Sequence, residues 1–131
     1  MRRRRAINLL AEAPERESGQ ATVELALTLP LVFIMLMAVL QVGIVVRDQV
    51  LVLHGAREAA RQAAVSSDPA GAARWAAMAA TGFRDLGVSV DVTDQMVVVH
   101  VHRDAPTDVP LVGALLGSVG LDASVTMRRE R

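Results

Sequence analysis

The chain contains no cysteine, lysine or tyrosine, and its only aromatic residues are Phe33, Trp75 and Phe83. Without cysteine it can form no disulfide, thiolate metal site or cysteine nucleophile, so any domain in an oxidising compartment must be stable without cross-links. The shortage of aromatic rings argues against nucleic-acid binding by base stacking. Charge is balanced, with 14 basic and 14 acidic residues among 131, so net charge indicates no nucleic-acid partner.

Motifs of catalysis and cofactor binding are also missing. The sequence has no HExxH motif, no glycine-rich phosphate loop and no serine–histidine–aspartate order. His100 and His102 would share one face of a strand with Asp91 across from them, but zinc needs a third ligand. We interpret them as polar residues on a solvent face. The expectation is a protein that is not an enzyme, with no catalytic, cofactor or metal site and no small-molecule substrate.

What the chain does have is one long apolar run. From Leu25 to Val46, 22 residues carry no charge. As a helix they span roughly 33 Å, enough for the hydrocarbon core of a bilayer. The run is longer than the apolar part of a secretory signal, and no small-residue cleavage site follows it. A retained membrane helix is therefore predicted, and the alternative is a cleaved export signal that releases a soluble domain.

Arginine placement predicts how this helix is oriented. Residues 2–5 and Arg16 precede the apolar run, whereas Arg47 alone stands directly after it. Basic residues favour the cytoplasmic side of a membrane helix. We therefore expect a single-pass protein of the cell membrane, with a cytoplasmic N-terminus and an extracytoplasmic C-terminal domain.

The helical pattern continues beyond the apolar run to Val65. Small residues at four-residue spacing would let another helix approach closely; they are Gly55, Ala56, Ala59, Ala60 and Ala63. Arg57 and Arg61 share a face and repel each other unless Glu58 or an acid of a partner subunit lies beside them. The alternative is that alanine merely favours a helix and that the arginines form a solvated face.

A polar, basic leader ends at Gly19, and Glu24 stands five residues later at the edge of the apolar run. A charge inside a membrane helix costs a few kcal/mol, so Glu24 is a functional candidate. A simpler alternative is that Glu24 is the last solvated residue before the lipid and that Gly19 is a flexible joint.

The junction from Gly19 to Glu24 resembles the signal of type IV prepilins and pseudopilins. In those proteins a prepilin peptidase cuts after a glycine, and a glutamate is the fifth residue of the mature chain. The resemblance implies cleavage between Gly19 and Gln20. It also implies that Glu24 neutralises the terminal amine of a neighbouring subunit. One departure is Leu25, at a position where Flp pilins usually carry tyrosine.

Together with Pro30 and the segment from Ala56 to Arg61, this junction resembles the TadE-like proteins of tight-adherence (Flp) pilus systems. The resemblance covers residues 18–65 well and the rest loosely. It implies a membrane-anchored minor pseudopilin that acts by helix–helix packing in Flp pilus assembly or the related secretion complex. The implied partners are membrane lipid, other pilus or pseudopilin subunits, the assembly platform and the prepilin peptidase. The alternative is a single-pass membrane protein whose outer domain binds an envelope partner or a soluble ligand.

Residues 66–131 are predicted to form a small outer domain. Asp68 is a good N-cap, and Pro69 suits the first turn of a helix that ends at Thr81 before Gly82. Trp75 on this helix should pack on the sheet. Alternating apolar and polar residues predict strands; these are 88–92, 96–102 and 121–129, with a loop at 106–120 that contains a short apolar helix at 111–116.

The expected fold class is therefore α+β. A long N-terminal helix, membrane-spanning and extended outward, precedes a small domain of one short helix and an antiparallel sheet of about three strands. We expect three parts: a cytoplasmic leader at 1–19, a transmembrane helix and stem at 20–65, and the extracytoplasmic domain at 66–131.

Overall fold

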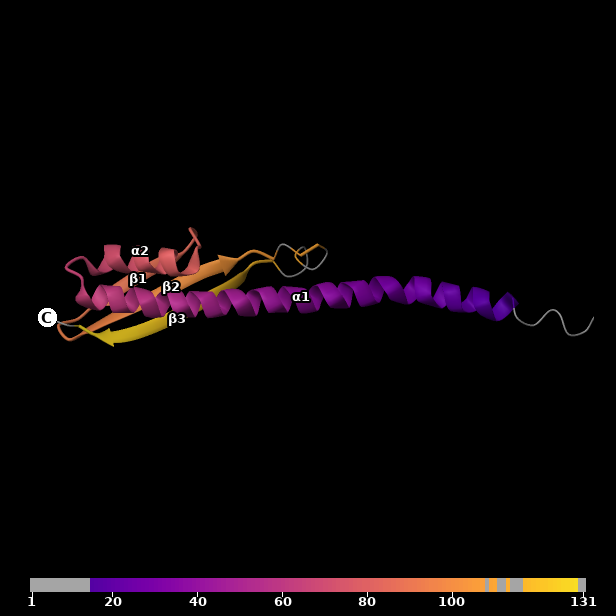
Figure 1. Cartoon of the computed structure of the whole chain (residues 1–131), viewed down its shortest axis with the longest axis horizontal. Coiled ribbons are helices and arrows are strands. Elements are labelled where there is room, and N and C mark those ends of the chain that lie inside the picture. The colour runs from indigo at the N-terminus through magenta and orange to yellow at the C-terminus, as the bar shows by residue number, and fades with distance from the viewer. Residues whose placement is uncertain (1–14, 108, 111–112, 114–116, 130–131) are drawn as a thin grey trace, which may run out of the picture. The chain divides into compact units, whose positions relative to one another are not determined.

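The computed structural model describes residues 15–107, 109–110, 113 and 117–129, with side chains from Gly19 onward (Figure 1). The described elements are α1 (Glu15–Val65), α2 (Pro69–Thr81), β1 (Gly87–Val92), β2 (Met96–Ala105) and β3 (Val119–Arg128). This order confirms the predicted α+β fold, with a long first helix, one short helix and three antiparallel strands. Residues 1–14 of the predicted leader, and most of the short helix predicted at 111–116, lie outside the described residues.

The chain divides into two compact units, Met1–Leu36 and Met37–Arg131. In the first unit, the described residues from Gly19 onward belong to α1 and are all exposed, apolar side chains included. Within the described residues, α1 is the one helix that is long and apolar enough to cross a membrane. Exposed leucine, valine and isoleucine side chains are unfavourable in water, whereas lipid solvates them. The apolar helix therefore indicates a single-pass membrane anchor.

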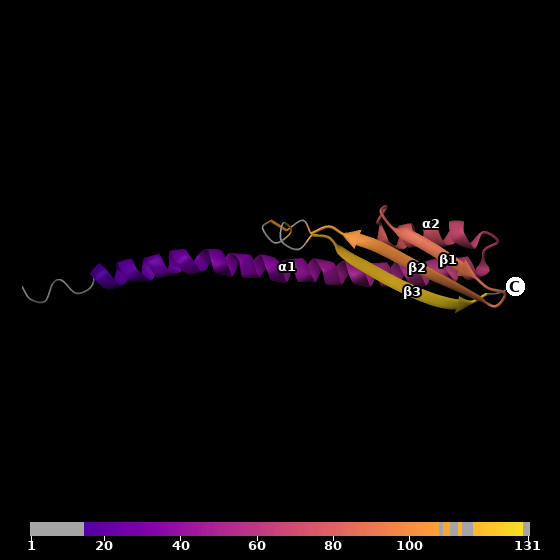
Figure 2. The same ribbon diagram turned by 180° about the vertical axis from the view of Figure 1, so that it is seen from behind.

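The second unit is a two-layer arrangement. Its antiparallel sheet has the order β1-β2-β3, and in the register Val99 of β2 lies opposite Val90 of β1 and Val125 of β3. The last part of α1 and the whole of α2 lie on one face of this sheet (Figures 1 and 2). Side chains of a strand alternate between the two faces, so every second residue of β2 is buried and the residues between them are exposed or half-buried.

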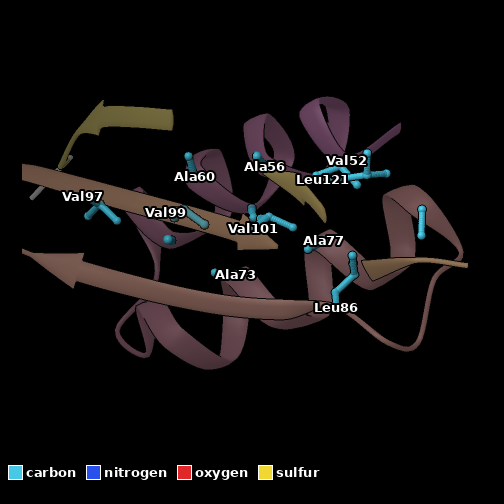
Figure 3. Packing of buried hydrophobic residues seen from close by; sticks show 13 residues of the cluster. Val52, Ala56, Ala60, Ala73, Ala77, Leu86, Val97, Val99, Val101 and Leu121 are labelled. Atoms are coloured by element: carbon cyan, nitrogen blue, oxygen red, sulfur yellow. The ribbon is translucent and has the colours of Figure 1, made fainter. Parts of the chain in front are cut away.

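The core between the layers combines alanines from the helices with valines from the sheet. Ala56 and Ala60 of α1 and Ala73 of α2 lie beside Val99 and Val101 of β2 (Figure 3). These five side chains are at most 1% exposed. Because alanine is short, both helix backbones approach the sheet closely, and the valines supply most of the buried volume.

The ends of α2 follow the predicted capping residues. The Asp68 side chain accepts a hydrogen bond of 3.1 Å from the Gly71 amide, which would otherwise have no partner in the first turn. At the other end Gly82 has φ +75°, and its amide donates to the Met78 carbonyl at 2.9 Å. A left-handed residue ends the helix here, and glycine adopts that conformation without strain.

The prediction that Trp75 packs on the sheet is wrong, because the side chain is 71% exposed. The buried face of α2 consists of Ala73, Ala76 and Ala77. Trp75 is two residues from Ala73, which places it on nearly the opposite side of a helix with 3.6 residues per turn. The alanine contacts also hold the backbone of α2 too near the sheet to leave room for an indole ring.

All three predicted strands exist, but their bounds differ from the predicted ones. β2 runs to Ala105 and not to residue 102, because Arg103 and Ala105 continue the buried positions of the strand. β3 begins at Val119, opposite Ala105, and ends at Arg128. The charges at 103 and 104 had interrupted the apolar pattern from which the end of β2 was predicted.

Candidate functional site

The predicted processing site lies inside α1. Gly19 and Gln20 are both exposed, and a Cβ built on Gly19 has no heavy atom within 4 Å. Glu24 is one turn further along and is also exposed. The Thr28 hydroxyl donates to the Glu24 carbonyl at 3.0 Å, a local bond that satisfies a polar group next to the apolar run. The processing role of Gly19–Gln20 and the amine pairing of Glu24 remain predictions.

The small residues of the stem are buried within the chain's own domain. Ala56, Ala59, Ala60 and Ala63 are 0% exposed. Gly55 is buried as well, and a Cβ at this position would lie 2.6 Å from Thr81 Cγ2 of α2. Gly55 therefore lies against α2 of the same chain, whereas Ala56 and Ala60 lie against the valines of the sheet; packing of the small residues with the helix of another subunit remains a prediction.

The stem charges lie on the solvent side of α1. The Arg61 guanidinium donates to Glu58 Oε1 at 2.8 Å, and Gln62 donates to the same oxygen at 3.1 Å. Glu58 therefore forms an ion pair with Arg61 within the helix, at i, i+3 spacing. Arg57 is exposed. Exposed pairs of this kind contribute little to stability, because solvent screens them.

Sequence reasoning missed a buried ion pair between the sheet and α1. Arg103 of β2 is 8% exposed, and its guanidinium donates to Asp48 Oδ2 at 2.8 Å. Its Nε donates to Asp85 Oδ1 at 3.2 Å, and the guanidinium lies 3.8 Å from the ring centre of Phe83. One arginine thus holds β2 to both α1 and the segment before β1. The signal was present, because the alternation of β2 places residue 103 on the buried face with Val99 and Val101.

A second polar contact joins α1 to β3. The Gln49 side chain donates to the Asp122 carbonyl at 3.0 Å. β3 is an edge strand, since the sheet order is β1-β2-β3. Edge strands expose backbone groups without partners, and Gln49 satisfies one of them. Nothing in the local sequence around Gln49 indicates this contact.

The outer face of the sheet carries the predicted histidines. His100 Nε2 lies 3.6 Å from Asp91 Oδ2, so the expected proximity is found. His102 has closer partners, with Nδ1 2.7 Å from Asp122 Oδ1 and Nε2 3.6 Å from Asp104 Oδ1. The hydrogen bond to Asp122 is the main reason that the pKa of His102 is raised above its ordinary value. Within the described ranges, no three His, Cys, Asp or Glu residues are grouped so that they could hold a metal ion.

Residues 19–61 match the family model described as TadE-like protein. The predicted resemblance is confirmed over these residues, which include the exposed apolar helix, the junction at Gly19 and most of the stem. No curated protein and no solved structure matches the chain. The family match and the apolar N-terminal helix fit a membrane-anchored protein related to the Tad pilus, and that family suggests contacts with other pilus components.

Proposed function

We propose that this chain is a TadE-like minor pseudopilin that takes part in Flp pilus assembly or in the related secretion complex. In this role it packs helix on helix and catalyses no reaction. The observation that carries the proposal is the position of the family match. It covers residues 19–61, which form the exposed apolar part of α1 and the stem that follows it.

The face of the stem that remains available to other subunits is a stripe opposite the buried alanines. Its members are exposed and follow one another at intervals of three or four residues, the spacing of a single helix face. We call it the outer stripe; it consists of Val46, Val50, His54, Arg57, Arg61 and Val65. The proposal assigns contacts with pilus or pseudopilin subunits and the assembly platform to this stripe, while the small residues hold the chain's own domain.

The N-terminal junction supports a role in subunit assembly. Cleavage by a prepilin peptidase between Gly19 and Gln20 would leave the whole apolar helix in the membrane and create a new terminal amine. Glu24 is exposed, so its carboxylate is available to the amine of a neighbouring subunit. In the low dielectric of the membrane edge such a pair is stronger than in water.

The proposed location is the cell membrane, with the N-terminus in the cytoplasm and the sheet domain outside. Arginines before the apolar run support this orientation. It places Gly19 on the cytoplasmic side, where the leader is accessible before the chain assembles.

The experiment is mass spectrometry of the native membrane-bound protein together with co-purification of a Glu24→Gln variant. We expect a mature chain that starts at Gln20. The variant should insert normally but recover less of the other pilus subunits. Asp94→Asn is the control, because Asp94 is exposed in the turn between β1 and β2, away from α1, and its loss should leave recovery unchanged.

Each outcome bears on a different part of the proposal. An intact leader would contradict processing, and equal recovery with both variants would contradict amine pairing. A soluble protein in the culture fluid that starts after residue 40 would contradict the membrane anchor itself.

A further inference from the structure

The outer face of the sheet carries three exposed aspartates. The last part of α1 and the whole of α2 pack on the other face, so no helix covers this one (Figures 1 and 2). Asp104 is one of the exposed positions of β2, and Asp91 and Asp122 share its face because they lie opposite Val98 and His102. We call these three the outer-face aspartates. Their side chains are 70–78% exposed, so their carboxylates are available to another molecule.

The exposed side of α1 carries the opposite charge. We give the name stem arginines to Arg47, Arg57 and Arg61, which are all exposed. Arg61 is nine residues, or two and a half helical turns, beyond the fully buried Val52, so it points away from the core. Arg57 lies one turn before Arg61 and Arg47 lies about four turns before it, on the same side of the helix.

The positive charge of the stem is only partly balanced within the chain. Among the residues that the structure describes, no acid forms an ion pair with Arg47 or Arg57. Arg61 pairs with Glu58. The other acid of the stem, Asp48, is buried in its ion pair with β2. The stem therefore presents a basic side to its surroundings.

The positive groups of the outer face do not cancel its negative charge. His100 and His102 together contribute at most two positive charges, against three aspartates. Arg128 also lies on this face, but at the turn before β2, where it and Asp94 line one hollow. The part of the face nearer the apolar run therefore stays negative.

Membrane anchoring restricts which residues of two copies can meet. The apolar run holds α1 of every copy at the same depth, because a shift would move apolar side chains into water or charged ones into lipid. A side chain can then contact a second copy only at about the same height. We define the level of a residue as the α1 residue that lies at its height.

Two of the outer-face aspartates lie at the level of the first stem arginine. Asp104 follows the arginine that contacts Asp48 at 2.8 Å. The carbonyl of Asp122 accepts a hydrogen bond of 3.0 Å from Gln49. Both aspartates are therefore at a level of about 46 to 49, which is the height of Arg47.

The third aspartate lies at the level of the other two stem arginines. Asp91 is opposite Val98, which precedes Arg103 by five residues in β2. β2 begins near the C-terminal end of α1 (Figures 1 and 2), so five strand residues lead away from the apolar run by about 17 Å, or about 11 helical residues. The level of Asp91 is therefore about 59, between Arg57 and Arg61.

β3 gives the same level independently. Thr126 lies opposite Val98, and it follows Asp122 by four residues. Four strand residues advance about 13 Å, or about nine helical residues beyond Gln49. The resulting level of about 58 agrees with the one from β2.

From this match of charge and height we infer that copies of this chain stack back to front in the membrane. The stem arginines of one copy face the outer-face aspartates of the next. This inference rests on the proposed membrane anchoring, and it names a second copy as a partner of the stem. Because the two surfaces lie on opposite sides of one domain, each copy can bind a neighbour on both sides, as in a ring or an open row.

Confinement to the membrane makes weak contacts sufficient. One exposed ion pair contributes little. Copies that share a depth and an orientation meet at a high effective concentration, so several such pairs act together. Complementary charge then determines which surfaces meet.

The test uses the absence of cysteine from the native chain. Ser124 lies opposite His100 on the outer face, at a level of about 54, and His54 is exposed on the stem. Full-length His54→Cys and Ser124→Cys variants, one with a size tag, are reconstituted together in phosphatidylcholine vesicles with one-quarter phosphatidylglycerol. A short bismaleimide then links cysteines of adjacent copies. Val65→Cys replaces His54→Cys in the control, because it is exposed but lies roughly 16 Å further along α1.

The mixture of His54→Cys and Ser124→Cys should give cross-linked dimers, and neither variant should do so alone. The control with Val65→Cys should give few. Arg57→Asp in the stem variant should lower the dimer yield about five-fold. Asp91→Arg in the outer-face variant should restore the yield, whereas Asp94→Arg on the distal turn should not.

Dimers from one variant alone would show that like surfaces meet and would overturn back-to-front stacking. Absence of dimers from the mixture, with both variants present in the vesicle fraction, would overturn stacking while leaving the membrane anchor intact. Variants that do not float with the vesicles would contradict the anchor, and with it this inference.

Discussion

A single residue, Arg103, joins three parts of the domain: β2, α1 and the segment before β1. Its guanidinium is surrounded by Asp48, Asp85 and the Phe83 ring, and its contact with α1 is buried. A buried pair gains little over apolar packing, but removal of one partner leaves an unpaired charge. The main effect of the pair is therefore to fix which residues of β2 lie beside which residues of α1.

Arg103→Met should destabilise the domain by about 3 kcal/mol, because Asp48 is then left buried without its partner. The double variant with Asp48→Leu should recover a substantial part of this loss. Hydrogen exchange of the β2 amides in detergent-solubilised protein measures the free energy of opening. Arg74→Met is the control, since Arg74 is exposed. A double variant no more stable than the single one would argue against a specific pair.

His102 should make the stability of the domain depend on pH. Its folded pKa is raised above 6.5, first by the hydrogen bond to Asp122. Protonation is therefore favoured by folding, so the stabilisation is complete below the unfolded pKa and is lost as pH rises through the folded pKa. Stability should therefore fall as pH rises above 6.5 and through the raised pKa of His102, by an amount that solvent exposure keeps small.

Asp122→Asn should lower the pKa of His102 and flatten this pH dependence, whereas Asp94→Asn on the distal turn should do neither. NMR titration of the His102 ring in both variants measures the pKa directly. An unchanged pKa in Asp122→Asn would show that the 2.7 Å contact does not favour the charged ring.

At the scale of elements, the first part of α1 is exposed on all sides, and its later part is covered on one face by the domain. Up to Leu36 its described side chains are exposed, and from Gln41 onward one face is buried by the chain's own domain. One small residue, Gly55, explains how α2 can pack against the stem. Gly55 removes the side chain at the point where Thr81 of α2 comes nearest, and close helix contact follows from the missing Cβ.

Gly55→Ala tests this contact. Alanine favours the helix by about 1 kcal/mol over glycine, but its Cβ would lie 2.6 Å from Thr81 Cγ2. We expect the steric cost to exceed the gain and to destabilise the domain by about 1–2 kcal/mol. Adding Thr81→Ser removes the methyl group, keeps the hydroxyl that donates to Ala77, and should reverse the loss.

Gly43→Ala provides the control in the same helix, because a Cβ there has no heavy atom within 4 Å. It should be neutral or stabilising by the same hydrogen-exchange measurement. Equal effects at 43 and 55 would indicate that helix propensity alone, and not the α1–α2 contact, determines the outcome.

At the scale of the whole molecule, the apolar helix and the small sheet domain have different roles. The helix supplies the membrane anchor, and the outer face of the sheet in the domain carries His100 and His102 with their aspartate partners. The core is built from alanine and valine without any cross-link, so a domain this small depends strongly on the stem that it covers. Anchor and domain are thus expected to act together.

The proposed orientation predicts that Asp94→Cys reacts with a membrane-impermeant maleimide in intact spheroplasts as fully as after lysis. The native chain should not react, because it has no cysteine. Reaction that requires lysis would place the sheet domain in the cytoplasm and contradict the orientation drawn from the arginines.

Much of the fold was predictable from local patterns. The 22-residue uncharged run, the Asp68-Pro69 start of α2 and the alternation in the strands each depend on neighbours in sequence, and the structure contains the corresponding elements. The TadE-like resemblance also came from short motifs, and the family match at residues 19–61 confirms it. Periodicity and capping are properties of a few consecutive residues, so no tertiary information was needed.

Tertiary structure alone decided which surfaces meet. Only packing showed that Gly55 of the stem contacts α2 of the same chain, that Trp75 faces outward, and that Arg103 pairs with Asp48 across 55 positions. Such contacts depend on how far two elements approach and at what level they meet. A sequence pattern defines the face of an element, whereas the partner of that face is set by the shape and charge of a segment far away in the chain.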